Sequence, residues 1–273
     1  MEQGEYQNQG SPEQNKGERI NPSGRGSQIK PFIAGAQPIE VVDETTEIPE
    51  ETGKRKIVPA TSSELEAIMG EFDKFMEKAA GWKLLTDYHK SYKIENAGNY
   101  AKYWLIQDFI AFLPQYEYVD PDGFNFFGVF LNPLIKKLPE RKVELKLKDL
   151  NTALPRPLGY LGYDLGWKIL DIEGDVGDNL GYENSGRIIL NGNAGDYAGI
   201  GMKGGLIEIS GNVGDSLGHM MEDGEIILNG HAGDYVGNLM SNGIIRINGG
   251  HKSVSRRKGG SIYDKNGKIV FGR

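Results

Sequence analysis

Four aspartates recur at near-constant spacing in the C-terminal half of this 273-residue chain. Asp196, Asp215 and Asp234 follow a 19-residue period, and an 18-residue step separates Asp178 from Asp196. In a stack of repeats their carboxylates would form a column able to supply oxygen ligands to a hard cation. Each carboxylate could instead accept backbone N–H groups at a turn, a common role of aspartate. We favour the turn role, because calcium-binding β-helices use nine-residue repeats, which this sequence lacks.

Three methionines, Met202, Met221 and Met240, follow the same 19-residue period. Their thioether sulfurs could bind a soft metal, but a flexible apolar side chain that fills a narrow core is the expected role. The four histidines share no position in the repeat: His89, His219, His231 and His251. We therefore expect no catalytic residue and no bound cofactor on this chain, and no metal beyond the disfavoured aspartate column.

A GxGxxG motif occurs at residues 199–204. Dinucleotide binding would require this motif to lie between a strand and a helix. Here its first glycine, Gly199, belongs to the 19-residue period, and Gly201 and Gly204 have no counterparts in the next repeat. We therefore expect the motif to be part of the repeat rather than a nucleotide site.

Glycines define the repeat itself. Each copy contains GxxGxxxG, and the four clear copies are Gly174, Gly177, Gly181; Gly192, Gly195, Gly199; Gly211, Gly214, Gly218; and Gly230, Gly233, Gly237. Gly159, Gly162 and Gly166 show the spacing once more, in a first coil predicted to lack one arm, and Gly249 opens a last copy. A fixed period of this length predicts a solenoid, with glycines at its corners.

A short apolar run precedes the first glycine of each repeat. The runs are Leu170–Ile172, Ile188–Leu190, Ile207–Ile209, Ile226–Leu228 and Ile245–Ile247. Alternation turns the ends of each run inward and its middle residue outward. The outward Ile189 and Ile227 either pack under the N-terminal region or form a partner surface. The pattern predicts a mainly β fold, a right-handed parallel β-helix of 19-residue coils.

Composition divides the chain into three parts. Residues 1–60 are polar and rich in Gly and Pro, which predicts a disordered tail. Residues 61–150 form a small α+β region that can cap the open end of the β-helix. Residues 151–273 are the β-helix, closed by a hairpin over Ile262–Phe271 with its turn at Asn266-Gly267.

Three helices and two strands are predicted in the α+β region. The first helix begins at Thr61 or Ser63, depending on which capping box forms, and runs through Ala79. The other predicted elements, in chain order, are a helix over Ala97–Leu113, a buried strand over Phe124–Leu131, a short helix that begins with Asn132 as N-cap and Pro133 as first residue and ends at Leu138, and a strand over Val143–Leu147.

Charge and cysteine content limit the function. The chain has no cysteine, which excludes disulfides and iron–sulfur ligation by this chain and fits a cytoplasmic location. The net charge of −7 argues against nucleic-acid binding, and no apolar run predicts a membrane span. Basic residues concentrate near the C-terminus, around Arg256, Arg257 and Lys258, as an end cap or as a docking site for an anionic ligand.

The repeat continues after its third glycine with a methionine and a further glycine, as in Gly199-x-x-Met202-x-x-Gly205. This pattern, which covers Leu158–Gly249, resembles the GXGXG domain that occurs in glutamate synthase large subunits and as one of the subunits of formylmethanofuran dehydrogenase. The resemblance implies a structural β-helix, with flavin, iron–sulfur or molybdenum/tungsten cofactors on partner subunits. On this basis we expect a non-catalytic assembly subunit of an oxidoreductase complex.

A second hypothesis places a pocket at the junction of the α+β region and the β-helix. Tyr160, Tyr163, Asp164 and Trp167 lie close together in the sequence there and could line it. A deep pocket would favour a stand-alone enzyme or a small-ligand-binding protein. A filled junction would favour the assembly protein.

Overall fold

The computed structural model describes residues 62–79, 100–115, 126–154 and 156–270. The predicted tail over residues 1–60 lies outside this part of the chain. None of the helices in the described ranges has both the length and the apolar character needed to cross a membrane.

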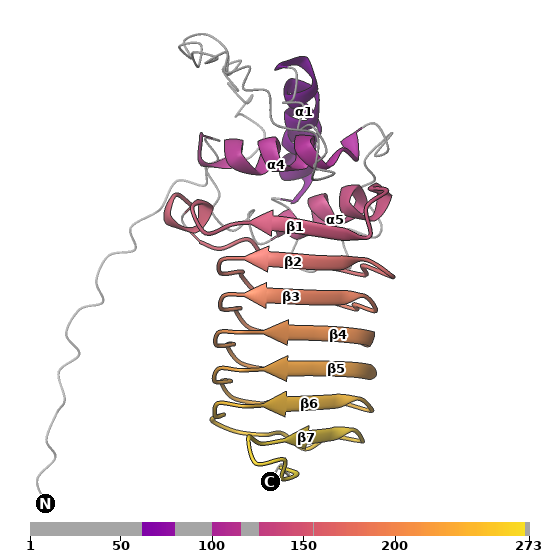
Figure 1. Cartoon of the computed structure of the whole chain (residues 1–273), viewed down its shortest axis with the longest axis vertical. Helices are drawn as coiled ribbons and strands as arrows, with labels where there is room; N and C mark the ends of the chain where they lie inside the picture. Colours follow the sequence, from indigo (N-terminus) through magenta and orange to yellow (C-terminus); the bar gives the residue numbers. More distant parts are fainter. Residues whose placement is uncertain (1–61, 80–99, 116–125, 155, 271–273) are drawn as a thin grey trace, which may run out of the picture. The chain divides into compact units, whose positions relative to one another are not determined.

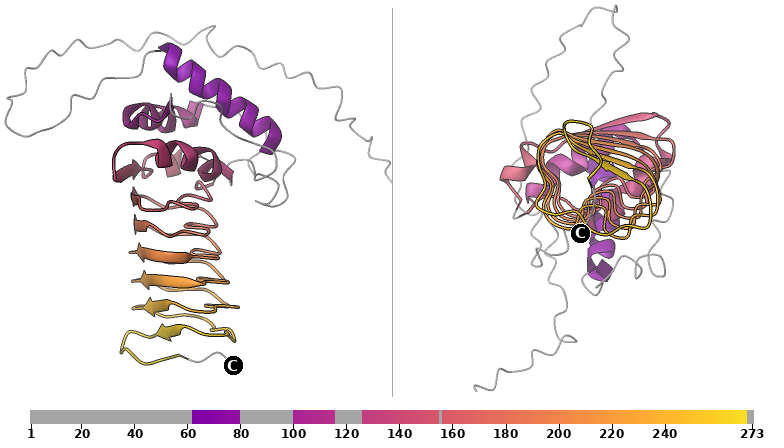
Figure 2. Two further views of the ribbon diagram at one scale, coloured as in Figure 1. Left: turned by 90° about the vertical axis from the view of Figure 1, so that its right-hand side faces the viewer. Right: turned by 90° about the horizontal axis from the view of Figure 1, so that it is seen from below.

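Seven strands stack in chain order, and every neighbouring pair is parallel (Figure 1). The strands are β1 (Lys142–Lys146), β2 (Ile169–Glu173), β3 (Arg187–Asn191), β4 (Lys203–Ile209), β5 (Asp223–Leu228), β6 (Ile244–Ile247) and β7 (Ser261–Tyr263). Viewed along the stack, successive coils lie over one another (Figure 2). The predicted parallel β-helix is therefore confirmed.

Equivalent residues of successive coils form the columns of the interior. Ile188, Ile207, Ile226 and Ile245 stand in register on β3 to β6 and are fully buried. Small apolar residues that follow the first glycine of each repeat form a further column, joined by parallel bridges: Val176, Ala194, Val213 and Ala232. One coil alone could not bury these side chains, so neighbouring coils stabilise each other.

The methionine column fills this interior. Met202, Met221 and Met240 are completely buried. The Cε of Met202 lies beneath Gly224, one coil further along, where an added Cβ would be only 2.8 Å from it. This confirms the predicted role of the methionines as core side chains.

The repeat glycines meet two different demands. At Gly192 an added Cβ would overlap the carbonyl oxygen of Gly174 in the preceding coil. Gly199 has φ +71, and an added Cβ would also meet Cδ1 of Ile226. Close backbone approach and a left-handed corner therefore both require glycine.

The predicted register of the first coil is wrong. Tyr160 and Asn179 share the left-handed conformation, with φ 54 and 63, so Gly162 and not Gly166 is the equivalent of Gly181. This coil is also longer than the others rather than shorter, because Lys142 of β1 pairs with Ile169. The spacing of Gly159, Gly162 and Gly166 predicted the wrong register because it matches GxxGxxxG without placing these glycines at the equivalent positions of the coil.

The helices that precede the sheet are α1 (Ser62–Ala79), α4 (Tyr103–Phe112) and α5 (Phe127–Lys137), with short 3₁₀ turns at Leu113–Gln115 and Leu150–Thr152. Aromatic rings join them, since the ring centroid of Phe72 lies 5.1 Å from that of Phe109 and 5.0 Å from that of Phe130.

The first two predicted helices are present, and the first begins at Ser62, directly after Thr61. Thr61 and residues 80–99 lie outside the described part of the chain, and Ser63 lies inside α1, so it is not the N-cap. The predicted helix over residues 97–113 is interrupted, because Lys102 has extended backbone (φ −120, ψ 126) before α4 begins. The predicted strand over Val143–Leu147 is confirmed as β1.

The strand predicted over Phe124–Leu131 and the helix start predicted at Asn132-Pro133 are wrong. Residues 127–137 form one helix, α5, with Pro133 inside it. A short, continuous apolar run does not distinguish a buried strand from a helix buried on all sides. Here residues 127–132 are all buried, between the aromatic rings on one side and the first coil on the other.

Helix α5 closes the first coil through Asn132. In later coils the amide at the third glycine donates to the preceding coil, as Gly181 does to the carbonyl of Leu161. The equivalent amide of Gly162 donates instead to Oδ1 of Asn132 at 3.1 Å, and Nδ2 of Asn132 donates to the carbonyl of Tyr160 at 3.0 Å. The side chain of Asn132 thus supplies the acceptor that a preceding coil would otherwise provide.

The predicted C-terminal hairpin is confirmed over its described residues. Tyr263 forms an antiparallel bridge with Ile269, and the amide of Asp264 donates to the carbonyl of Lys268. Gly267 has φ +71 at the turn. The first strand of the hairpin is also β7, the last strand of the sheet.

Candidate functional site

The aspartate column is a chain of hydrogen bonds between coils. Oδ1 of Asp178 accepts the amide of Asp196 at 2.8 Å, Oδ1 of Asp196 accepts that of Asp215 at 2.7 Å, and Oδ1 of Asp215 accepts that of Asp234 at 2.7 Å. The predicted role as acceptor of a backbone amide is confirmed for these three aspartates, with the donor in the next coil, whereas Asp234 accepts the hydroxyl of Ser253 at 2.8 Å. Among the described residues no group of three or more His, Asp or Glu side chains is arranged to hold a metal ion.

A second hydrogen-bonded column, which the sequence analysis missed, runs beside the first. Oδ1 of Asp175 accepts the amide of Asn193 at 2.7 Å, Asn193 accepts that of Asn212, and Asn212 accepts that of His231. The recurrence of Asn193 and Asn212 at one position of the repeat was the available signal. His231 ends this column as an exposed side chain rather than a ligand.

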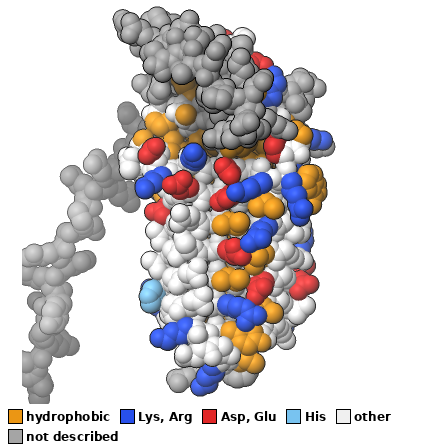
Figure 3. Space-filling model, in the orientation of Figure 1, with side chains coloured by type: hydrophobic (Ala, Val, Ile, Leu, Met, Phe, Trp, Pro, Cys, Tyr) orange, Lys and Arg blue, Asp and Glu red, His pale blue; other side chains and the backbone are white. Residues whose placement is uncertain are grey.

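The outer face of the sheet mixes charged and apolar side chains (Figure 3). Its ion pairs connect neighbouring strands, as Arg187 does with Glu208 at 3.1 Å and Arg246 with Glu225 at 2.6 Å. Ile189 and Ile227 lie half-buried on this face and do not belong to the aromatic core of the helices. The described helices therefore do not bury them, and the choice between packing under the N-terminal region and a partner surface stays open.

The GxGxxG motif forms a corner and leads into a strand. Gly199 and Gly201 have positive φ, and β4 begins at Lys203. No helix follows the motif, so it lacks the context that a dinucleotide site needs. The interpretation as part of the repeat is confirmed.

Four large apolar side chains are exposed along one corner of three consecutive coils. We call Tyr197, Met220, Tyr235 and Leu239 the corner strip; each is between 40% and 58% exposed. All four also have left-handed backbone, with φ between 54 and 62. A left-handed residue other than glycine or asparagine costs roughly 1–2 kcal/mol. These positions therefore carry a backbone cost and an exposed apolar surface together.

His219 lies beside the corner strip, directly before Met220 in the chain and in contact with Tyr197. Its ring meets that of Tyr197 edge-on at 5.8 Å, and its Nδ1 is 3.2 Å from Nδ2 of Asn238. Burial lowers the pKa of His219 below its ordinary value, which favours the neutral ring. Tyr197 of the strip therefore has an uncharged aromatic ring as its neighbour.

Among the described residues at the junction between helices and coils, three of the four residues predicted to line a pocket there pack or pair instead. Tyr160 stacks on Phe126 at 5.3 Å, Tyr163 packs against Tyr182 at 5.5 Å, and Asp164 pairs with Lys136 at 2.7 Å. Burial raises the pKa of Tyr160 to about 12, since the ionised phenol would lose solvation. Only Trp167 remains exposed.

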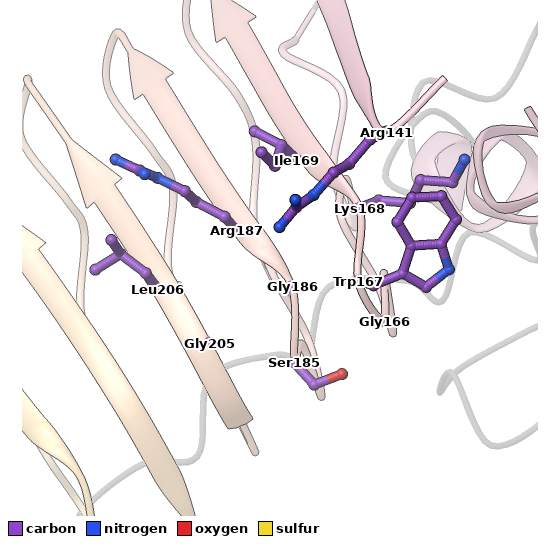
Figure 4. A pocket seen from close by; sticks show the side chains of 10 residues that line it. All are labelled: Arg141, Gly166, Trp167, Lys168, Ile169, Ser185, Gly186, Arg187, Gly205 and Leu206. Atoms are coloured by element: carbon purple, nitrogen blue, oxygen red, sulfur yellow. The ribbon is translucent and has the colours of Figure 1, made fainter. Parts of the chain in front are cut away.

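Trp167 lines a shallow pocket of about 290 Å³ beside the first strands (Figure 4). Arg141, just before β1, extends across it, and Arg187, at the start of β3, lines it while its side chain points toward β4, where it binds Glu208. Ile169 and Leu206 supply apolar walls. These residues are remote in sequence, and only the parallel register of the strands brings them together.

A buried lysine supports the pocket. Lys168 is 1% exposed, and its ammonium donates to the carbonyl of Leu138 and, at 2.6 Å, to that of Glu140. The same ammonium lies 4.4 Å from the centroid of the Trp167 ring. Burial lowers the pKa of Lys168, although Glu140 acts in the opposite direction.

Comparisons of the chain with protein-family models, with curated proteins and with solved structures found no match.

Proposed function

We propose that this chain is a non-catalytic assembly protein that binds another protein through the corner strip. The strip supports this proposal because its side chains lower the stability of the chain on which they stand. The equivalent positions are left-handed in the other coils as well. They hold Gly201 and Asn179, which tolerate this backbone at less cost, and also Ser216 and Glu183, which are small or polar. Met220, Tyr235 and Leu239 adopt the left-handed backbone at a higher cost, and their side chains are exposed. An intermolecular contact would account for both features.

The charges near the strip suggest the chemistry of the partner. Asp196 directly precedes Tyr197, Asp234 directly precedes Tyr235, and the exposed Glu222 follows Met220 closely in the chain. Arg256 and Arg257 lie one coil beyond Leu239, since the amides of Ser255 and Lys258 donate to the carbonyls of Val236 and Met240. Charges of both signs therefore border the strip, and its carboxylates favour Lys or Arg at the matching positions of a partner segment with apolar side chains. The partner we propose is thus a protein surface of this kind.

The resemblance of the repeat to the GXGXG domain suggests where such a partner belongs. In the relatives, the β-helix is an assembly element and other domains or subunits carry the redox cofactors. We propose that the partner is a subunit of an oxidoreductase complex, with any flavin, iron–sulfur or molybdenum/tungsten cofactor on that subunit. Tyr160, Tyr163 and Asp164 are engaged in packing or an ion pair, which supports this function over that of a stand-alone enzyme with a pocket lined by these residues.

Site-specific photo-crosslinking in the native cells tests the proposal. A photoreactive amino acid replaces Tyr235 in the strip or, as the control, Ile269, which is exposed on the C-terminal hairpin. We expect Tyr235 to give one major adduct, with a basic and apolar segment of a redox-enzyme subunit, and Ile269 not to give it. An adduct pattern that is the same from both positions would contradict docking at the strip. An adduct specific to Tyr235 but with a protein outside redox complexes would reject only the proposed complex.

A further inference from the structure

The pocket beside Trp167 has a local charge opposite to that of the molecule. The chain carries a net charge of −7, yet three cationic side chains line this pocket: Arg141, Lys168 and Arg187. Glu208 neutralises one of them, since it accepts from Nη2 of Arg187 at 3.1 and 3.2 Å. The pocket therefore keeps an excess of positive charge.

Arg141 is the cation best placed to meet a ligand. Its side chain is exposed and has no hydrogen-bond or ion-pair partner within the described part of the chain. It extends from the residue before β1 toward β3, across the pocket (Figure 4). A guanidinium group presents two parallel N–H donors, which match the oxygens of a carboxylate or a phosphate.

Trp167 supplies a flat apolar surface next to this donor. The indole is 62% exposed, the largest exposure among the large apolar side chains of the described residues. Lys168 holds it by a cation–π contact, and Lys168 is itself fixed by two main-chain carbonyls. An exposed indole kept in place in this way is preorganised for stacking with a planar ring.

We propose that this pocket binds a small aromatic anion. Its ring stacks on Trp167 and contacts Ile169 and Leu206, and its carboxylate or phosphate accepts hydrogen bonds from Arg141, with Arg187 as the second cation. The volume of about 290 Å³ accommodates a ligand of one or two rings. This site is separate from the corner strip and does not depend on the proposed assembly function.

Calorimetric titration of the full chain tests the site with defined probes. Phenyl phosphate and benzoate carry both ring and anion, inorganic phosphate lacks the ring, and benzyl alcohol lacks the charge. We expect one of the two aromatic anions to bind at least about tenfold more tightly than inorganic phosphate and benzyl alcohol. The stronger of the two identifies the acidic group that the pocket prefers.

Three variants locate the binding. Arg141→Gln should lower the affinity for the aromatic anion about tenfold or more. Trp167→Ala should reduce that affinity to the value for inorganic phosphate. Arg256→Gln, which replaces an exposed arginine of the basic C-terminal region, should leave the affinity for the aromatic anion unchanged. Both pocket side chains are exposed, so folding is expected to persist, and circular dichroism checks it. Equal binding by Arg141→Gln and the wild type, or no binding of either aromatic anion at about 10 mM, would overturn the proposal.

Discussion

Oδ1 of Asp196 accepts a hydrogen bond from the backbone amide of Asp215, its equivalent in the next coil, at 2.7 Å. This carboxylate also explains a glycine, because an added Cβ at Gly214 would overlap Oδ1 of Asp196. The aspartate and the second glycine of the repeat therefore depend on each other: Gly195, Gly214 and Gly233 leave room for the carboxylate of the aspartate in the preceding coil.

Replacement of Asp196 by alanine should destabilise the β-helix by about 2 kcal/mol, because the amide of Asp215 loses a charged acceptor. Asp196→Asn keeps an oxygen at this position and should cost less than about 1 kcal/mol. Urea denaturation measures both. Equal losses in the two variants would show that the charge itself, rather than the hydrogen bond, is needed. A rise in melting temperature on addition of Ca²⁺ would revive the metal hypothesis for the column.

Gly192→Ala should be severely destabilising, by about 3 kcal/mol or more, since the new Cβ would meet the main-chain carbonyl of Gly174, which cannot rotate away. The matched control is Gly204→Ala. Gly204 has no atom within 4 Å of an added Cβ, and its φ lies outside the left-handed region, so alanine there should be neutral or slightly stabilising. Thermal unfolding of the two variants separates steric overlap from a general intolerance of alanine in the repeat.

The double variant Met220→Asn/Leu239→Asn should be at least as stable as the wild type, with a gain of up to about 1 kcal/mol. Asparagine tolerates the left-handed backbone better, and this gain offsets the packing lost from two half-exposed side chains. Chemical denaturation checks the expectation. If the variant loses more than about 1 kcal/mol, these side chains serve the stability of the chain, and the case for a docking surface is lost.

Alkaline pH should destabilise the protein partly through Tyr160. Burial raises its pKa from 10.0 to about 12, so the folded state binds the phenol proton more tightly than the unfolded state does. This contribution is fully present below about pH 10 and disappears as the pH rises through about 12. Unfolding free energies measured from about pH 9 to about pH 11.5 should fall less steeply for Tyr160→Phe than for the wild type. Identical slopes would mean that the phenol ionises as freely in the folded as in the unfolded state.

The β-helix could be predicted because its period is encoded locally in every coil. Gly192, Gly211 and Gly230 occur at the same step as Asp196, Asp215 and Asp234, so one alignment of the repeat gives strands, corners and core together. The hydrogen-bonding role of the aspartates followed from residue type. Their donors in the next coil could not be identified until the register was known.

The errors occurred where the sequence leaves the period. Phe127–Leu131 is apolar throughout, and only the surrounding aromatic core and first coil select a helix there. Trp167 was predicted as part of a junction pocket, but its neighbours in space, Arg141 and Arg187, belong to other coils. The corner strip was missed because its mark, a left-handed backbone under large side chains, has no signature in residue type.

The composition of the native assembly tests the central claim most directly. The full-length chain, tagged at its genomic locus and expressed at its native level, would be purified under mild conditions and its mass and stoichiometry measured by native mass spectrometry. We predict a fixed ratio to a redox-enzyme subunit, loss of that subunit in the Met220→Asn/Leu239→Asn variant, and its retention in the Ile269→Asn control. A wild-type protein recovered alone, or a strip variant that keeps the partner at wild-type ratio, would contradict the account.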